Sequence, residues 1–316
     1  MSGALGWKRY EHDCPSYYIL RCEREMIGQV ANDLHELDLV PQGVPFIDLG
    51  PGTIEAVEEK SLPVVLALNS HTYVPVDVSL KFCSEAGGVI KQHLRDVVVS
   101  SSVENFFSDE VDPALDTAGI GFLGGITIAN IEAPLSKEKP TQELINGLKN
   151  LARITGGGWL LLTTDANQSE AENKAMYSEN GLFEINTFYR MAHELPFKGL
   201  NPDGFVYDPY WIPESSQLGH TALATEDMLV EVSSSCFTGI IPVRKGQRYH
   251  LKNSFKYTDE FFIRCAKAAG YSVIEKWSHH EKPLRFFLLK APALELAARN
   301  DSQFPRQALL EKRLIA

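Results

Sequence analysis

The sequence predicts an α/β fold, a doubly wound, Rossmann-like sheet of mostly parallel strands that binds its ligand at the carboxyl ends of the strands. Short apolar runs alternate with helical segments, which is typical of βαβ units. A glycine-rich turn directly follows the first of these runs, and the composition changes in the second half of the chain. The predicted strands are 44–49, 73–78, 96–100, 120–128 and 158–164, and the predicted helices are 27–39, 80–94 and 137–154.

The Gly-Pro-Gly-Thr turn at 50–53 follows an apolar strand that carries an acid, Asp48. Glycines let the backbone turn tightly, and the N–H groups at the start of the next helix can hold an anion. Asp77 closes the second strand, where the acid of a nucleotide-type cofactor site accepts hydrogen bonds from ribose hydroxyls. Position 55 is glutamate, whereas a nicotinamide-binding turn has a third glycine there, so the pattern favours S-adenosylmethionine. The alternative is that Asp77 only caps the helix that starts at Ser79.

The residues from 182 to 243 are rich in aromatic residues, proline, glycine and serine, and they predict an inserted β-rich lobe. Its expected strands are 228–232 and 236–243. The strand–helix alternation returns with a helix over 257–269 and a terminal strand pair at 270–274 and 285–290, with His279 and His280 in the surface loop between them. The expected domains are a cofactor domain of 21–167 plus 257–292, a substrate-recognition lobe of 1–20 plus 168–256, and a helical tail of 293–316 that offers an oligomer contact.

The charge balance limits the classes of partner. The 316 residues carry 30 Lys and Arg against 41 Asp and Glu, a formal net charge of −11. Duplex nucleic acid and anionic membranes both need a basic face, so neither is an expected partner. The five cysteines are scattered without a C-x-x-C pair, which predicts reduced thiols and no metal site. No apolar run reaches membrane-spanning length and no signal-peptide core is recognised, so a cytoplasmic location is expected.

Seven short motifs occur along the chain in an order known from one enzyme family. They are Tyr17-Tyr18-Ile-Leu-Arg21-Cys-Glu23, Leu49-Gly50-Pro51-Gly52-Thr53, Val76-Asp77-Val78-Ser79, Gly125-Ile-Thr-Ile-Ala-Asn130, Leu160-Leu-Leu-Thr-Thr-Asp165, Met176-Tyr177-Ser178-Glu179 and Leu251-Lys252-Asn253-Ser254-Phe255-Lys256-Tyr257. In this order the chain resembles the histidine Nα-methyltransferase family of ergothioneine biosynthesis, whose fungal relatives methylate tryptophan or dimethylallyltryptophan. The resemblance covers nearly the whole chain, from about residue 16 to residue 290.

The resemblance implies a class I methyltransferase sheet with an inserted substrate lobe, and S-adenosylmethionine as the cofactor. It implies that Asn130 and Tyr177 grip the α-carboxylate of an amino acid and that Tyr17 lines the amine site. Tyr17 and Tyr177 are the implied catalytic residues. The implied cofactor-binding residues are Gly50, Gly52, Thr53, Asp77, Ser102 and Val103, and the implied contacts to the substrate side chain are Lys252, Asn253 and Ser254.

Lys252 is the most consequential departure from the family, because the histidine enzymes have a glutamate there that bonds the imidazole. A cation cannot accept that bond, so we expect a substrate other than histidine. Residues 219–223, Gly-His-Thr-Ala-Leu, also replace a methionine wall of the family's pocket. One alternative is that Lys252 points to solvent and the pocket is simply larger, and Asn253 takes over part of the recognition.

Two cofactor contacts differ as well. The family's acid for the adenine amine falls near Ser102 and Val103, with Glu104 as a substitute, and a family lysine after the glycine turn is Ala56 here, with Lys60 one turn later.

The function expected from the sequence is an S-adenosylmethionine-dependent N-methyltransferase that acts on a free amino acid by in-line transfer to a neutral amine. A second possibility is that Lys252 takes the carboxylate. The substrate would then be reversed, and a side-chain nitrogen such as an arginine guanidinium would be methylated, with its cation held by Glu184, Asp208 or Glu214. A third possibility is a non-catalytic protein that binds S-adenosylmethionine or its demethylated product.

Overall fold

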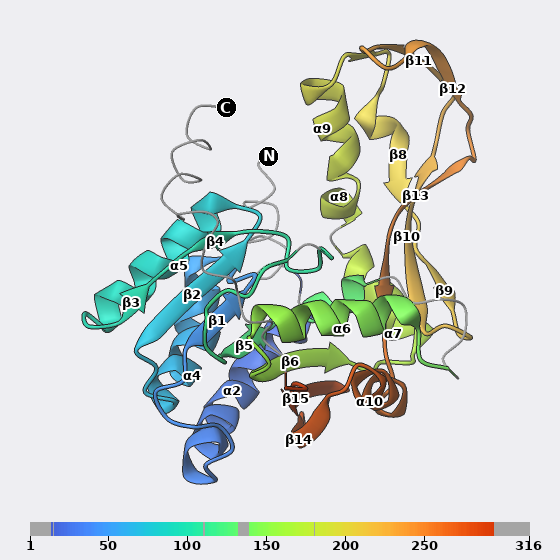
Figure 1. The fold of residues 1–316 in the computed structure, drawn as a ribbon. Coiled ribbons are helices and arrows are strands. Elements are labelled where there is room, and N and C mark those ends of the chain that lie inside the picture. Colours follow the sequence, from blue (N-terminus) through green and yellow to red (C-terminus); the bar gives the residue numbers. More distant parts are fainter. Residues whose placement is uncertain (1–13, 15, 110, 132–138, 180, 294–316) are drawn as a thin grey trace.

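The computed structural model describes residues 14, 16–109, 111–131, 139–179 and 181–293, so the predicted tail lies outside the described residues. Within these ranges an eight-stranded sheet forms the body of the molecule (Figure 1). Its order is β14-β15-β6-β5-β1-β2-β3, and β4 also pairs with β2. The pairs from β3 to β6 are parallel, and β15 runs antiparallel to both of its neighbours. The strands are β1 (Phe46–Leu49), β2 (Thr72–Asp77), β3 (Val98–Val99), β4 (Ser102–Val103), β5 (Ile120–Leu123), β6 (Trp159–Asp165), β14 (Ser272–Ser278) and β15 (Leu284–Lys290).

Helices cover both faces of this sheet, which confirms the doubly wound α/β prediction. One apolar core joins the sheet to α2 (Ile19–Glu36), α4 (Leu62–Ala67) and α5 (Leu80–His93). A second core, on the other face, joins it to α6 (Gln142–Ile154) and α10 (Asp259–Ala268). Between β1 and α4 the chain forms a short helix, α3 (Ile54–Ala56), and a π-helical turn, η1 (Val57–Ser61).

Two predicted elements differ from the structure in ways that affect the site. The strand predicted over 120–128 ends at Leu123, because Gly125 and Ile126 have positive φ angles of 64° and 51° and turn the backbone into the 3₁₀ helix η2 (Thr127–Asn130). The helix predicted to begin at residue 27 begins at Ile19. Its first turns bury Glu23 among apolar residues, and a buried charge interrupts the apolar spacing that marks a helix in the sequence.

The inserted lobe is confirmed as β-rich, and it rises beyond one end of the large sheet (Figure 1). The long strands β10 and β13 run from the body toward its tip. One of its sheets has the order β13-β10-β8 with β9 also on β10, and the other has the order β12-β11-β7. The elements are α7 (Glu170–Ser178), α8 (Gly181–Glu184), α9 (Asn186–Glu194), β7 (Phe197–Lys198), η3 (Pro202–Gly204), β8 (Phe205–Tyr207), β9 (Tyr210–Ile212), β10 (Gln217–Ala224), β11 (Met228–Ser233), β12 (Thr238–Val243) and β13 (Arg248–Phe255).

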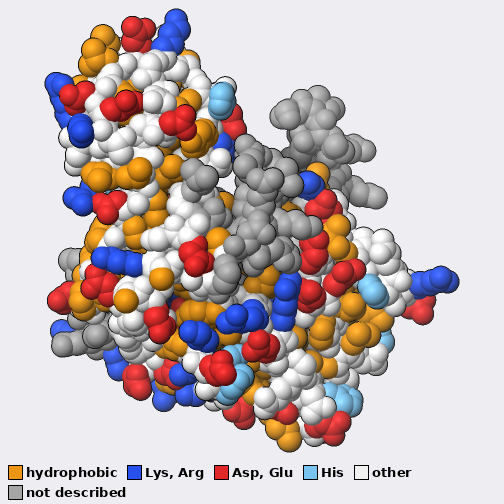
Figure 2. All heavy atoms as spheres, turned by 180° about the vertical axis from the view of Figure 1, so that it is seen from behind, with side chains coloured by type: hydrophobic (Ala, Val, Ile, Leu, Met, Phe, Trp, Pro, Cys, Tyr) orange, Lys and Arg blue, Asp and Glu red, His pale blue; other side chains and the backbone are white. Residues whose placement is uncertain are grey.

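The described surface carries charges of both signs. On the face shown in Figure 2, the basic and acidic side chains of the described residues are interspersed rather than gathered into one broad basic area. Among the helices that the structure describes, none has the length and apolar character needed to cross a membrane.

Candidate active site

The glycine turn lies at the carboxyl end of β1, directly beside the end of β2. Gly50 and Gly52 both have φ = +74°, a conformation that favours glycine. The N–H of Gly50 donates to the carbonyl of Val76 at 2.8 Å. A Cβ on Gly50 would lie 3.8 Å from the Phe106 ring and 4.0 Å from Oδ2 of Asp77, so the turn is closely fitted against the second strand end.

Thr53 and Asp77, two of the implied cofactor-binding residues, lie at the carboxyl ends of β1 and β2. Thr53 caps α3, since its hydroxyl accepts from the N–H of Ala56 at 3.3 Å. Asp77 is half-buried, its Oδ1 accepts from the N–H of Ser79 at 2.8 Å, and burial raises the pKa of its carboxyl. The side chain that caps α5 is that of Ser79, so Asp77 is not needed as the helix cap.

Ser102 and Val103 lie next to Asp77, on the short strand β4. The register pairs Val76 with Ser102 and Asp77 with Val103. The Ser102 hydroxyl donates to Glu104 Oε1 at 2.8 Å, which brings that carboxylate to the same edge. A carboxylate beside a tight glycine turn, with a second acid one strand away, fits the sugar hydroxyls and the base amine of an adenosyl group.

A buried polar cluster occupies the carboxyl end of β6, at the same edge of the sheet. Lys256 and Asp165 are fully buried and form an ion pair, with Nζ to Oδ2 at 2.7 Å. Nζ also donates to Oη of Tyr177 at 3.4 Å, and Tyr18 donates to the other oxygen of Asp165 at 2.7 Å. Burial opposes the charge of Lys256, but Asp165 and Tyr177 outweigh it and raise its pKa. Because an ammonium only donates, the hydroxyl hydrogen of Tyr177 points away from Lys256.

Tyr17 and Tyr177 come together, as expected for two residues of one site. Their rings make an edge contact with centroids 6.2 Å apart, and both are buried. The segment that carries Tyr17 is tied to the end of α7 by Glu179, which accepts from the N–H of Ser16 at 3.0 Å and from its hydroxyl at 2.7 Å.

Asn130 is exposed at the end of η2, which follows the end of β5. The carbonyl of the next residue, Ile131, accepts from the hydroxyl of Tyr257 at 2.8 Å. Tyr257 directly follows Lys256, the residue that bonds Tyr177. The residue after Asn130 and the side chain of Tyr177 are therefore both bonded to the segment that follows β13.

Glu23 is a structural residue of the site whose contacts the sequence did not reveal. Its fully buried carboxylate accepts from Lys60 Nζ at 2.9 Å, and from the N–H of Gly125 and the hydroxyl of Thr163 at 2.6 Å each. It thus ties α2 to η1 and to the ends of β5 and β6. Lys60, which the sequence offered as a cofactor contact, is directed into this cluster.

The three residues expected to contact the substrate side chain lie on β13 but on two faces. Lys252 and Ser254 share one face because side chains alternate along a strand, and Asn253 lies on the other. Lys252 pairs with the buried Glu184 at 3.0 Å. These two residues also line a cavity of about 560 Å³ between α8, α9 and β13, to which Phe183, Phe188, Met191 and Leu251 contribute apolar walls.

His220 joins the substrate side of the site from β10. It is completely buried, with Nε2 3.0 Å from the Ser254 hydroxyl and Nδ1 2.7 Å from the Tyr207 hydroxyl. Its ring lies edge-on to Tyr177, with centroids 4.7 Å apart. Burial, with help from the positive charges of Lys252 and Lys256, lowers the pKa of His220 to about 2, so the imidazole is neutral.

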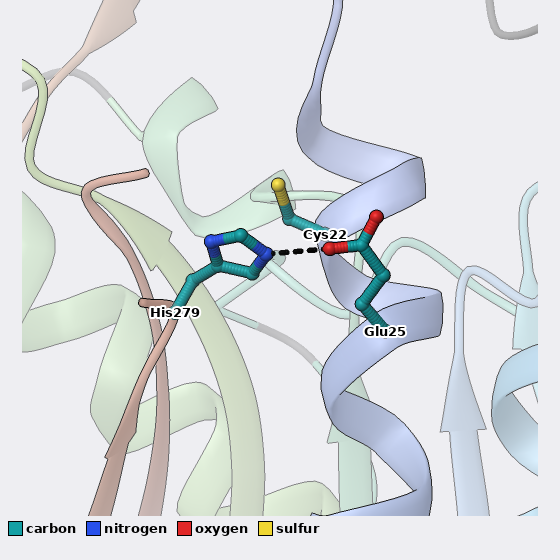
Figure 3. Close-up of side chains that lie close together, drawn as sticks. All are labelled: Cys22, Glu25 and His279. Atoms are coloured by element: carbon teal, nitrogen blue, oxygen red, sulfur yellow. Dashed lines mark hydrogen bonds and ion pairs between the residues drawn. The ribbon is translucent and has the colours of Figure 1, made fainter. Parts of the chain in front are cut away.

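Cys22, Glu25 and His279 also lie close together (Figure 3). Nδ1 of His279 accepts from the N–H groups of Glu281 and Lys282, both at 3.1 Å, so Nε2 carries the proton and donates to Glu25 at 2.8 Å. Burial raises the pKa of Cys22 to about 11, which keeps it a thiol. The group ties α2 to the β14–β15 turn. The expectation of a surface loop holds for His280 but is wrong for His279, which is buried against α2.

Comparisons with known proteins identify the family of this chain. The sequence profile of a family described as "Histidine-specific methyltransferase, SAM-dependent" matches residues 3–291. The uncharacterized protein y4iF of Sinorhizobium fredii (strain NBRC 101917 / NGR234) is 28% identical over 301 residues, covering 87% of this chain and 94% of its own.

Two solved methyltransferase structures match the chain at low sequence identity. One is the CcbJ methyltransferase from Streptomyces caelestis, with a TM-score of 0.45 and 14% identity, covering 85% of this chain and 90% of its own. Another is an S-adenosylmethionine-dependent methyltransferase from Clostridium acetobutylicum ATCC 824, with a TM-score of 0.44 and 11% identity, covering 86% and 91%. By its profile match over nearly the whole chain, the protein belongs to the histidine-specific, S-adenosylmethionine-dependent methyltransferase family and has the class I α/β fold of such an enzyme.

Proposed function

We propose that the protein methylates the α-amine of a free amino acid other than histidine. The observation that carries this proposal is the meeting of Tyr17 and Tyr177 at the strand edge that also carries the glycine turn and Asp77. When bound, S-adenosylmethionine supplies an electrophilic methyl group: as the N–C bond forms, the S–C bond breaks with its electron pair left on sulfur, and the amine loses one proton.

The residues of the chain bind and orient the amino-acid substrate. The hydroxyl of Tyr177, fixed by Lys256, is a donor for one carboxylate oxygen, and the exposed amide of Asn130 is a donor for the other. Neutral donors suit a carboxylate next to a sulfonium, because they hold it without adding a competing ion pair. The amine then faces Tyr17, whose phenol can relay the departing proton to water. Alignment of this kind contributes roughly 7–11 kcal/mol in well-oriented reactions.

The contacts of the acidic residues favour this orientation over a reversed substrate. Reversal requires Lys252 to take the carboxylate and lobe acids to hold a side-chain cation. Lys252 instead pairs with Glu184, and Asp208 pairs with Arg248 at 2.6 Å. Breaking the pair between Lys252 and the buried Glu184 would add to the cost of that binding mode.

The test is incubation of the protein with S-adenosylmethionine and each proteinogenic amino acid, followed by mass detection of singly, doubly and triply methylated products. Fragmentation locates the methyl group on the α-nitrogen if the proposal holds. A methyl group on a side-chain nitrogen would support the reversed orientation. Cofactor binding by calorimetry with no product from any amino acid would contradict the proposal and support the non-catalytic alternative.

A further inference from the structure

Every residue expected to meet the substrate side chain already has a polar partner within the chain. This inference rests on the proposed amino-acid methyltransferase function and concerns what kind of side chain the substrate carries. The three pairs are Lys252 with Glu184 at 3.0 Å, Asn253 with Gln217 at 2.7 Å, and Ser254 with His220 at 3.0 Å.

The Ser254–His220 contact lies beside Tyr177, whose ring makes an edge contact with His220. His220 has no exposed surface, and both of its ring nitrogens lie next to hydroxyls, those of Ser254 and Tyr207. A neutral imidazole has one donor and one acceptor nitrogen, so these two contacts use its hydrogen-bonding capacity. The imidazole of the chain itself thus takes one hydrogen bond of the Ser254 hydroxyl, and Ser254 is buried.

The Glu184–Lys252 pair is neutral as a whole. The Glu184 side chain is only 3% exposed, and burial raises the pKa of its carboxyl while Lys252 opposes that shift. A substrate anion would compete with Glu184 for Lys252, and a substrate cation would compete with Lys252 for Glu184. An anion that took Lys252 would leave the Glu184 carboxylate buried without its cation, which is strongly unfavourable. A cation that took Glu184 would displace Lys252, whose side chain is 42% exposed, at a smaller cost.

We propose that the methylated amino acid has an uncharged side chain without hydrogen-bonding groups. Because these polar groups already have partners within the chain, a polar side chain gains less from them than it loses in hydration. A site of this kind rejects an isostere with one added hydroxyl by roughly 10–100-fold in kcat/KM, and rejects an amide or a charge more strongly.

Matched pairs of nearly equal shape test this directly in the wild-type enzyme. We expect kcat/KM for valine to exceed that for threonine by about 10-fold or more, and the ratio of leucine to asparagine to be larger still. Equal or reversed ratios, with methylation of the α-amine intact, would overturn this inference and leave the proposed function standing. Binding of S-adenosylhomocysteine without methylation of any amino acid would overturn the proposed function, and this inference with it.

The Glu184→Gln variant provides a second test of the inference. It leaves the Lys252 ammonium without its anion, so the kcat/KM ratio of aspartate to asparagine should rise at least about 10-fold over the wild-type ratio. The control is Asp208→Asn, which removes an acid paired with Arg248 in the same sheet and should leave the ratio unchanged. Unchanged S-adenosylhomocysteine affinity in both variants shows that they are folded. An unchanged ratio in folded Glu184→Gln contradicts the inference.

Discussion

The cofactor end and the side-chain end of the candidate site differ in how their polar side chains are paired. At the cofactor end, Gly50 and Asp77 present a tight turn and a half-buried carboxylate at the sheet edge, where the hydrogen bonds to Asp77 Oδ1 come from backbone. At the side-chain end, Lys252 and Ser254 are paired with other side chains of the lobe. We expect the first region to bind the adenosyl group of the cofactor and the second to disfavour polar side chains. Two regions of one site can thus differ in how many of their polar groups remain available to a ligand.

Between the two ends lies the buried Lys256–Asp165 pair, and its loss should have the largest effect. Lys256→Met leaves the Asp165 carboxylate buried without its cation, so the free energy of unfolding should fall by about 3–5 kcal/mol in urea titrations. Lys276→Met is the matched control, since Lys276 pairs with Asp259 while 39% exposed, and it should cost less than about 1 kcal/mol. Equal losses of unfolding free energy in the two variants would show that burial does not determine the contribution of these ion pairs.

The cofactor end should show its own pH dependence through Asp48. Burial raises the pKa of Asp48 to about 6 in the folded protein, above 3.8 for an unperturbed carboxyl. The folded state then binds more protons at Asp48 between these values, so the contribution of Asp48 to stability is fully present below about pH 4. It is lost as the pH rises through about 6, by up to about 3 kcal/mol. Asp48→Asn should remove this slope from the unfolding free energy. If the free energy of unfolding has the same pH dependence in the wild type and in Asp48→Asn, Asp48 is not the source of the slope.

Asp77→Asn tests the cofactor end itself. Loss of a charged acceptor for sugar hydroxyls should weaken S-adenosylhomocysteine binding about 10–100-fold by calorimetry, equivalent to about 1.5–3 kcal/mol. Asp96→Asn, a change at an exposed acid in the loop before β3, should leave the affinity unchanged. If Asp77→Asn binds as tightly as the wild type, Asp77 does not hold the cofactor.

Tyr177→Phe should have a smaller effect that is confined to the substrate. It removes one neutral donor to the carboxylate, so KM for the amino acid should rise about 10-fold, or about 1.4 kcal/mol, with cofactor affinity unchanged. Lys256 keeps Asp165 as its main partner in this variant. A loss of cofactor affinity as large as the change in KM would assign Tyr177 to the other end of the site.

The sequence predicts the parts of this molecule that follow from local pattern. Apolar runs mark β1, β2 and β6, and the glycine turn marks the cofactor end, because these signals lie within a few neighbouring residues. It does not predict the buried charges Glu23 and Lys256, since a charged residue looks exposed until its partner from a distant segment is known.

The side-chain end is hidden from the sequence for the same reason. The contact of Lys252 with Glu184 depends on how α8 packs against β13, and that of Ser254 with His220 depends on the pairing of β13 with β10. The predicted domain boundaries, cytoplasmic location and oligomer contact stay predictions.

The carboxylate grip is the central claim, and kcat/KM of Asn130→Ala for the best methylated amino acid tests it most directly. An amide that bonds the carboxylate contributes about 1.5–3 kcal/mol, so we predict a fall of about 10–100-fold, with S-adenosylhomocysteine affinity unchanged. A variant that keeps wild-type kcat/KM would show that Asn130 does not hold the substrate, and the common site of Asn130 and Tyr177 would be wrong.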